Sequence, residues 1–263
     1  MAIDTKSVFC RAYNSANYTS LNFEQFLGQC EAIARLDEPA VSGAALANTR
    51  GAWYAWLIAI ESIRFGQSNP LASFLVKLPN VSSFDSISLY EESISKLVVD
   101  FREKLSLAGD VNLTTSNPDY VIISRELGYA LPDITGVIAP VNLEQIDTFY
   151  RNFVGRCNLD QIVGYLGAKS SVRPDRRIQL LHEGSLTKAI YTHLQTRLWL
   201  INPKGIKYYA VSMSFGPADL AGLKSVATHS IASSAMKPEP AIDIATSVFD
   251  TQTAHSFFNQ VLV

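Results

Sequence analysis

Residues 160–183 read DQIVGYLGAKSSVRPDRRIQLLHE and contain the two elements from which we predict the fold. The first half, up to Ser171, is rich in β-branched and apolar residues, which is typical of a buried strand. Pro174 then fits the first turn of a helix, and the helical pattern continues to Trp199. A buried strand followed directly by a long helix predicts an α/β domain in which the helix packs on a sheet.

The segments on either side contain further apolar helical stripes and short apolar strands. The predicted helices occupy residues 23–36, 51–65, 89–106, 141–156, 174–199, 216–224 and the stretch from residue 240 onward, and the predicted strands occupy residues 118–127, 160–171 and 204–215. Helices come first and then alternate with strands, which predicts an α/β fold with a mixed central sheet flanked by helices. Two glycines inside the second strand, Gly164 and Gly167, indicate that another part of the chain approaches its backbone closely.

The length and composition are ordinary for a globular protein, with 263 residues of which 48% are hydrophobic and 17% charged. We expect one domain over residues 1–263, with a helical N-terminal part (1–108), an α/β core (about 110–215) and a C-terminal segment (216–263). The formal net charge is only −2. Any binding of nucleic acid must therefore come from a local basic patch, because the chain as a whole has no excess of positive charge.

The cysteines and the N-terminus point to an intracellular protein. Cys10, Cys30 and Cys157 are odd in number and lack the spacing of a metal site, so we expect three reduced thiols. The first residues lack the apolar core of a signal peptide, and no stretch approaches the roughly 20 apolar residues that cross a bilayer. We expect a cytoplasmic protein that needs neither a membrane nor an organic cofactor.

Charged residues gather at the junction between the predicted strand and helix of residues 160–199. Lys169 ends the strand, an Arg-x-Asp-Arg run begins the helix, and Glu183 follows two turns later. If the helix begins near Pro174, then Arg176, Gln179 and Glu183 share one of its faces. This stretch therefore places a lysine, arginines and a carboxylate in one neighbourhood.

A second carboxylate, Asp119, opens the predicted strand 118–127 directly after a proline. A carboxylate beside a buried sheet costs free energy unless it is paired or binds a cation. Two carboxylates can hold Mg²⁺, which prefers oxygen ligands. A nearby ammonium such as Lys169 offsets the charge that develops when a phosphate is attacked.

The Arg-x-Asp-Arg run has a possible partner in duplex DNA. Arginine pairs with guanine in the major groove and aspartate accepts from cytosine, so Arg173, Asp175 and Arg176 could read adjacent G·C pairs. The alternative is a charged helix start in which these residues form salt bridges only with one another. The run alone leaves both interpretations open.

Asp119, Lys169 and Glu183 together resemble the PD-(D/E)xK nucleases in a variant form. In the common form the second acid lies two residues before the lysine, and here that position is Gly167. The type II restriction endonucleases that recognise CCGG-containing sites, the NgoMIV-like group, carry this acid on the following helix in the pattern PD…K-x(3)-R-x-D-R-x(6)-E. This sequence is similar to that group over residues 116–195, and the positions that match are Pro118, Asp119, Lys169, Arg173, Asp175, Arg176 and Glu183.

The resemblance implies a restriction-endonuclease-like fold and Mg²⁺-dependent, site-specific cleavage of double-stranded DNA that leaves 5′-phosphate ends. It implies that Asp119 and Glu183 ligate Mg²⁺ and that Lys169 assists the attacking water. The residues that it assigns to reading the C·G pairs of a CCGG or interrupted CC–GG site are Arg173, Asp175 and Arg176. Members of the group cut as homodimers, sometimes assembled into tetramers, and we expect flanking bases to be read by loops and by the C-terminal segment around residues 226–240.

The sequence departs from this group at one supporting position. Relatives carry a metal-supporting glutamate on an N-terminal helix, and here Ala55 stands where it would fall. Glu61 lies two turns too far along that helix, and Glu126 is another acid that could serve. Two alternatives to a type II site-specific deoxyribonuclease therefore stay open: a DNA-binding protein of the same fold without nuclease activity, and an unrelated α/β protein whose charged run is a salt-bridged helix cap.

Overall fold

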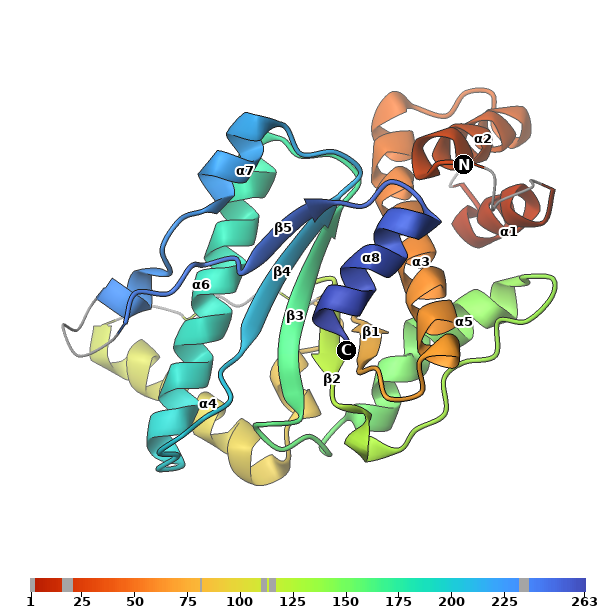
Figure 1. Cartoon of the computed structure of the whole chain (residues 1–263). Helices are drawn as coiled ribbons and strands as arrows, with labels where there is room; N and C mark the ends of the chain where they lie inside the picture. The colour runs from red at the N-terminus through yellow and green to blue at the C-terminus, as the bar shows by residue number, and fades with distance from the viewer. Residues whose placement is uncertain (1–2, 16–20, 81, 110–112, 114–116, 232–236) are drawn as a thin grey trace.

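The computed structural model of the chain describes residues 3–15, 21–80, 82–109, 113, 117–231 and 237–263 (Figure 1). Its strands are β1 (Phe74–Lys77), β2 (Tyr120–Ile123), β3 (Ile162–Lys169), β4 (Lys207–Ser212) and β5 (Ile244–Ser247). Its α-helices are α1 (Thr5–Ser15), α2 (Phe23–Asp37), α3 (Gly43–Ser68), α4 (Glu92–Gly109), α5 (Pro140–Thr148), α6 (Pro174–Arg197), α7 (Pro217–Leu223) and α8 (Thr251–Val261). Short 3-10 turns are η2 (Ser86–Leu89), η3 (Arg125–Leu127), η4 (Phe149–Phe153) and η5 (Thr228–Ile231).

The strands form one five-stranded sheet in the order β1-β2-β3-β4-β5. The pairs β1–β2 and β2–β3 are antiparallel, whereas β3–β4 and β4–β5 are parallel. The helix α6 connects the parallel neighbours β3 and β4, as a crossover between parallel strands requires. The expected α/β fold with a mixed central sheet flanked by helices is therefore confirmed.

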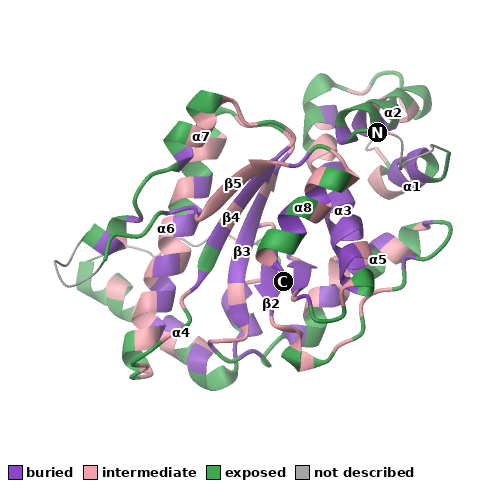
Figure 2. Ribbon diagram, in the orientation of Figure 1, coloured by how far each residue is buried: buried purple, intermediate pink, exposed green. Residues whose placement is uncertain are grey.

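Each face of the sheet is covered by its own helical layer (Figures 1 and 2). Alternate side chains of a strand point to opposite faces, and β4 shows this clearly. Tyr208 and Ala210 belong to the core on the α6 side, while Tyr209 and Val211 belong to the core on the side of α3 and α8. Because the sheet is buried on both faces, its strands are largely apolar except where they end.

The long helix of the opening stretch begins at Pro174 as predicted and ends at Arg197, two residues earlier than expected. The helix expected at residues 141–156 begins earlier, because Pro140 is the first residue of α5, and the side chain of Asn142 accepts a hydrogen bond from the backbone N–H of Ala139. Proline sets the backbone angle of a first helical turn, which moves the start upstream.

Two of the strands are not among those predicted from the sequence. β1 lies inside the part expected to be helical, and β5 lies inside the C-terminal stretch expected to be helical, where only α8 is a helix. Both strands have four residues and lie at the edges of the sheet. They are too short to show a periodic pattern of apolar residues, so that only their pairing with β2 and β4 identifies them as strands.

The cysteines agree with the expectation of unpaired thiols. Cys10, Cys30 and Cys157 are free and buried. Burial raises the pKa of Cys10 to about 11 and that of Cys157 to about 12, so these thiols stay protonated and unreactive at neutral pH. Among the described helices, none combines the length and the apolar character needed to cross a membrane.

Candidate active site

Asp119 and Lys169 meet where the start of β2 lies beside the end of β3. The two strands are antiparallel, with Tyr120 opposite Leu166. Oδ2 of Asp119 accepts hydrogen bonds from the backbone N–H of Ala168 at 2.7 Å and from the ammonium of Lys169 at 2.9 Å. The Lys169 side chain is 9% exposed and that of Asp119 is 34% exposed. The lysine side chain is therefore buried, whereas the carboxylate that accepts its hydrogen bond is partly open to solvent at the ends of the strands.

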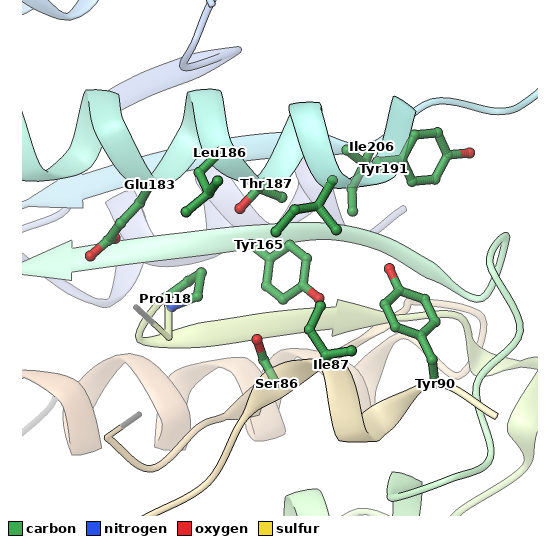
Figure 3. Close-up of a pocket in the computed structure, with 11 residues that line it drawn as sticks. Ser86, Ile87, Tyr90, Pro118, Tyr165, Glu183, Leu186, Thr187, Tyr191 and Ile206 are labelled. Carbon is green, nitrogen blue, oxygen red and sulfur yellow. The ribbon is translucent and has the colours of Figure 1, made fainter. Parts of the chain in front are cut away.

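Glu183 faces the sheet from α6 and is 3% exposed. The hydroxyl of Tyr208 donates to its Oε2 at 2.5 Å, and the amide Nε2 of Gln179 donates to its Oε1 at 2.9 Å. The bond from Gln179 confirms that residues 179 and 183 share one face of the helix. Figure 3 shows Glu183 projecting from α6 toward the strands, with Pro118, the neighbour of Asp119, nearby. Glu183 and Pro118 line the same cavity of about 30 Å³.

Strand alternation places all three groups on the face covered by α6. In β3 this face carries Tyr165, which belongs to the core on the α6 side, and hence Gly167 and Lys169. In β2 it carries Val121, so the residue two positions earlier, Asp119, lies on the same side. The structure therefore brings Asp119, Lys169 and Glu183 together between β2, β3 and α6.

Gly167 explains why no carboxylate projects from β3 itself. A Cβ at this position would lie 2.4 Å from Cδ2 of Leu180 and 3.0 Å from the hydroxyl oxygen of Tyr208. The close approach expected at Gly164 and Gly167 is confirmed, since a Cβ at Gly164 would lie 3.0 Å from the backbone oxygen of Lys207. The space that a side chain at position 167 needs is occupied by Leu180 and by Tyr208, whose hydroxyl donates the hydrogen bond to Glu183.

Burial raises the pKa of Tyr208 well above its ordinary value, and the nearby negative charge of Glu183 raises it further. Tyr208 therefore stays protonated at neutral pH and donates to the carboxylate. Its bond to Oε2 compensates part of the free-energy cost of keeping the Glu183 carboxylate away from water.

The donor set fits a hard divalent cation. Within the described residues, Oδ1 of Asp119 accepts no hydrogen bond, which leaves an oxygen of a partly exposed carboxylate available. No cluster of three or more His, Cys, Asp and Glu side chains occurs among the residues described, so a zinc-type site has no basis there. One or two carboxylates completed by water and substrate phosphate are the set that Mg²⁺ uses.

The expected base-reading run lies at the start of α6. The guanidinium of Arg173 pairs with Asp175 at 3.0 and 3.2 Å, and the two side chains are 66% and 64% exposed. This hydrogen-bonded guanidinium lowers the pKa of Asp175. Arg176 is partly exposed. In the free chain, Arg173 and Asp175 therefore form a salt bridge with each other, as the alternative interpretation expected. This salt bridge is open to solvent.

Arg177 is a residue of this region that the sequence interpretation did not use. Its guanidinium lies 3.2 Å from a carboxylate oxygen of Asp219, and it also donates to the backbone oxygen of Ala218 at 3.4 Å. These contacts tie the start of α6 to α7. The only sequence signal was the second arginine of the Arg-Arg pair, because Asp219 is distant in sequence.

The three positions considered for a supporting acid have different surroundings. The backbone oxygen of Ala55 accepts a hydrogen bond from the hydroxyl of Tyr120, next to Asp119. Glu61 is fully buried and pairs with Arg64 at 3.0 Å and His255 at 3.2 Å, where α3 meets α8. Glu126 is exposed and lies beyond the opposite end of β2.

Comparison with known proteins places this geometry in a family. Residues 13–262 match the model of the Cfr10I/Bse634I restriction endonuclease family. The type II restriction enzyme Cfr10I of Citrobacter freundii is 46% identical over an alignment of 209 residues, which covers 77% of this chain and 73% of that protein.

Solved structures agree with this match. The crystal structure of the type IIF restriction endonuclease Bse634I with cognate DNA superposes with a TM-score of 0.87 at 28% identity, over 100% of this chain and 93% of that one. A second structure of Bse634I gives a TM-score of 0.87 at 28% identity, over 99% of this chain and 92% of that one.

These findings decide between the alternatives left by the sequence. A match over nearly the whole chain excludes an unrelated α/β protein, and the relatives are enzymes that cut DNA. Restriction endonucleases generally need a divalent metal, which agrees with the donor set of the site. The chain belongs to the Cfr10I/Bse634I restriction endonuclease family and is a type II restriction endonuclease.

Proposed function

We propose that this enzyme is a Mg²⁺-dependent endonuclease that cuts double-stranded DNA at a C·G-rich site, CCGG or an interrupted CC–GG. It leaves 5′-phosphate and 3′-hydroxyl ends. The observation that supports this most strongly is the convergence of Asp119, Lys169 and Glu183 on one face of the sheet, with Lys169 bonded to Asp119.

Asp119 and Glu183 hold the cation. Glu183 serves in place of the acid that the common motif carries two residues before the lysine, where this chain has Gly167. A bound Mg²⁺ supplies charge neutralisation at the phosphate and a more acidic water. Lys169 has its ammonium held next to Asp119 at 2.9 Å, in a position largely shielded from solvent. From there it orients the attacking water and offsets the charge that grows on the phosphate oxygens.

Arg173, Asp175 and Arg176 read the C·G pairs from the start of α6. The loop between Lys169 at the end of β3 and Pro174 at the start of α6 is only four residues long, so the base-reading side chains and the catalytic lysine lie at the same edge of the sheet. On binding, the exposed salt bridge between Arg173 and Asp175 opens, and each side chain exchanges its partner for a base edge. Solvent-exposed pairs of this kind contribute little to stability, so the exchange costs little.

The active form is a homodimer or a tetramer built from it. Each chain contains one set of Asp119, Lys169 and Glu183, whereas a duplex has two strands to cut. The whole chain, 1–263, acts as one nuclease domain in the cytoplasm, and the segment 226–240 reads flanking bases. Residues 232–236 of that segment lie outside the described residues.

The test is digestion of phage DNA with the purified protein and Mg²⁺. Discrete fragments whose sequenced ends share a C·G-rich site and carry a 5′-phosphate are the expected result. A smear would contradict site-specific cleavage, and uncut DNA at every Mg²⁺ concentration would contradict the proposal as a whole. Light scattering on the protein–DNA complex measures the oligomeric state of the protein. A monomer that binds and cuts the DNA would contradict the proposed dimer.

A further inference from the structure

The two oxygens of the Glu183 carboxylate have partners of different kinds. Oε2 accepts from the hydroxyl of Tyr208, a fully buried side chain of β4. Oε1 accepts from the amide of Gln179, an exposed residue one turn earlier on α6. One oxygen is therefore held from the core of the protein and the other from its surface.

Tyr208 is itself fixed to the helix that carries Glu183. Its backbone N–H donates to the carboxylate of Asp243 at 2.9 Å, and the same carboxylate forms a salt bridge with the buried ammonium of Lys188 at 2.8 Å. Lys188 lies on α6. The tyrosine thus contacts α6 at two levels, directly through Glu183 and through Asp243, which fixes the distance between helix and strand.

The hydroxyl of Tyr208 also depends on the absence of a side chain at position 167. It lies 3.0 Å from the position that a Cβ on Gly167 would take, on the side of the sheet that faces α6. The glycine that removes a carboxylate from β3 therefore leaves room for the group that holds the carboxylate of α6.

We propose that Tyr208 is a positioning residue for the cation site. Its hydroxyl anchors Oε2 of Glu183, so that Oε1 faces the site and can exchange the Gln179 amide for a cation. This inference rests on the proposed function, in which Glu183 is a ligand. Hydrogen-bond partners of metal ligands typically account for a factor of about 10–100 in metal affinity or activity.

Three variants test this. Tyr208→Phe keeps the buried ring and removes the hydroxyl, and Gln179→Ala removes the exchangeable partner. The matched control is Tyr54→Phe, because Tyr54 is also a buried tyrosine whose hydroxyl donates, at 2.9 Å, to the backbone oxygen of Val248 in another part of the core. The measurements are Mn²⁺ binding, from the resonance of free Mn²⁺, and the Mg²⁺ concentration that gives half of the maximal single-turnover rate.

For Tyr208→Phe we expect both the Mn²⁺ dissociation constant and the half-maximal Mg²⁺ concentration to rise by about 10–100-fold. Saturating Mg²⁺ should then restore the rate to within a few-fold, and DNA binding in a gel shift should stay unchanged. For Gln179→Ala we expect the Mg²⁺ requirement to fall, because the Gln179 amide no longer competes with the cation for Oε1. Tyr54→Phe should behave like the wild type in both titrations.

The idea is overturned if Tyr208→Phe titrates like the wild type, or if Tyr54→Phe shifts the Mn²⁺ affinity equally. If Tyr208→Phe does not fold, as a urea titration would reveal, Gly167→Ala provides a second test, because its methyl group would displace the hydroxyl and should raise the Mg²⁺ requirement. A wild-type chain that never cuts DNA would refute the proposed function, whereas the Mn²⁺ titration would still decide the role of Tyr208.

Discussion

The Lys169 ammonium lies 2.9 Å from Oδ2 of Asp119, although the two residues are 50 positions apart in the chain. The contact exists because β2 and β3 run antiparallel with Tyr120 opposite Leu166, which places Asp119 opposite Gly167 and two residues from Lys169 at the end of β3. The same oxygen also accepts the backbone N–H of Ala168. The lysine is thereby held at the carboxylate without needing to be a ligand of the cation.

Replacing Lys169 with alanine should separate cutting from binding. The single-turnover cleavage rate should fall by about 10²–10³-fold, the range found when one charge-stabilising donor is removed from an active site. Asp119 keeps its bond from Ala168, so the fold and the affinity in a gel shift should hold. Lys204→Ala, at an exposed lysine outside the site, is the control. Normal cutting by Lys169→Ala would refute its catalytic role.

Removing Arg176 should weaken recognition more than chemistry. Arg176→Ala should cost about 1–3 kcal/mol of binding free energy on the cognate site for each lost bidentate contact, and it should relax discrimination at that base pair. Competition gel shifts with oligonucleotides altered at single positions measure this. Arg151→Ala, an exposed arginine on η4, should leave the pattern intact. Equal weakening on all sequences would show that Arg176 contacts only phosphate.

The packing around Gly167 predicts opposite effects for two glycine substitutions. Gly167→Ala places a methyl group 2.4 Å from Leu180 and should lower the free energy of unfolding by about 1–3 kcal/mol. Gly28→Ala, on α2 with nothing within 4 Å, should raise it by about 0.5–1 kcal/mol. Urea titrations measure both. If Gly167→Ala is as stable as the wild type, the close approach of Leu180 is wrong.

Stability should fall as the pH is lowered from 7.5 to 5.5, in part through His193. Its ring stacks on that of Phe101, with the ring centroids 4.1 Å apart. Burial lowers the pKa of His193 from its ordinary value of 6.5, and the positive charge of Arg197 lowers it further. The unfolded chain then binds a proton more readily than the folded one, so stability present above pH 6.5 is lost as the pH falls.

Urea unfolding at the two pH values checks this for the wild type and for His193→Gln. The variant should lose less stability between pH 7.5 and 5.5 than the wild type. His229, whose pKa is also lowered by burial, contributes in the same direction and remains in both proteins. An identical pH dependence would contradict the role of His193.

The sequence predicted those parts of the fold whose signals are local. Pro174 marks the start of α6, and the β-branched run before Lys169 marks β3. The edge strands β1 and β5 could not be predicted, because four residues show no period and all residues of β5 are half-buried. What makes them strands is pairing with β2 and β4, which are distant in the chain.

The candidate site shows the same division. Spacing and resemblance singled out Asp119, Lys169 and Glu183, but no pattern pointed to Tyr208. It stands beside a second tyrosine, Tyr209, and only the alternation of β4 sends one ring toward α6 and the other toward α8. The bond from Tyr208 to Glu183 depends on the packing of helix on sheet, which the order of residues alone does not give.

The central claim is that the second acid of the site stands on α6. It is tested most directly by the single-turnover cleavage rate of Glu183→Gln at saturating Mg²⁺, on an oligonucleotide that carries the mapped site. Glutamine keeps an acceptor for Tyr208 but removes the charge, so we predict a rate at least about 10²-fold below that of the wild type, with DNA binding retained. Cleavage at the wild-type rate would contradict the account.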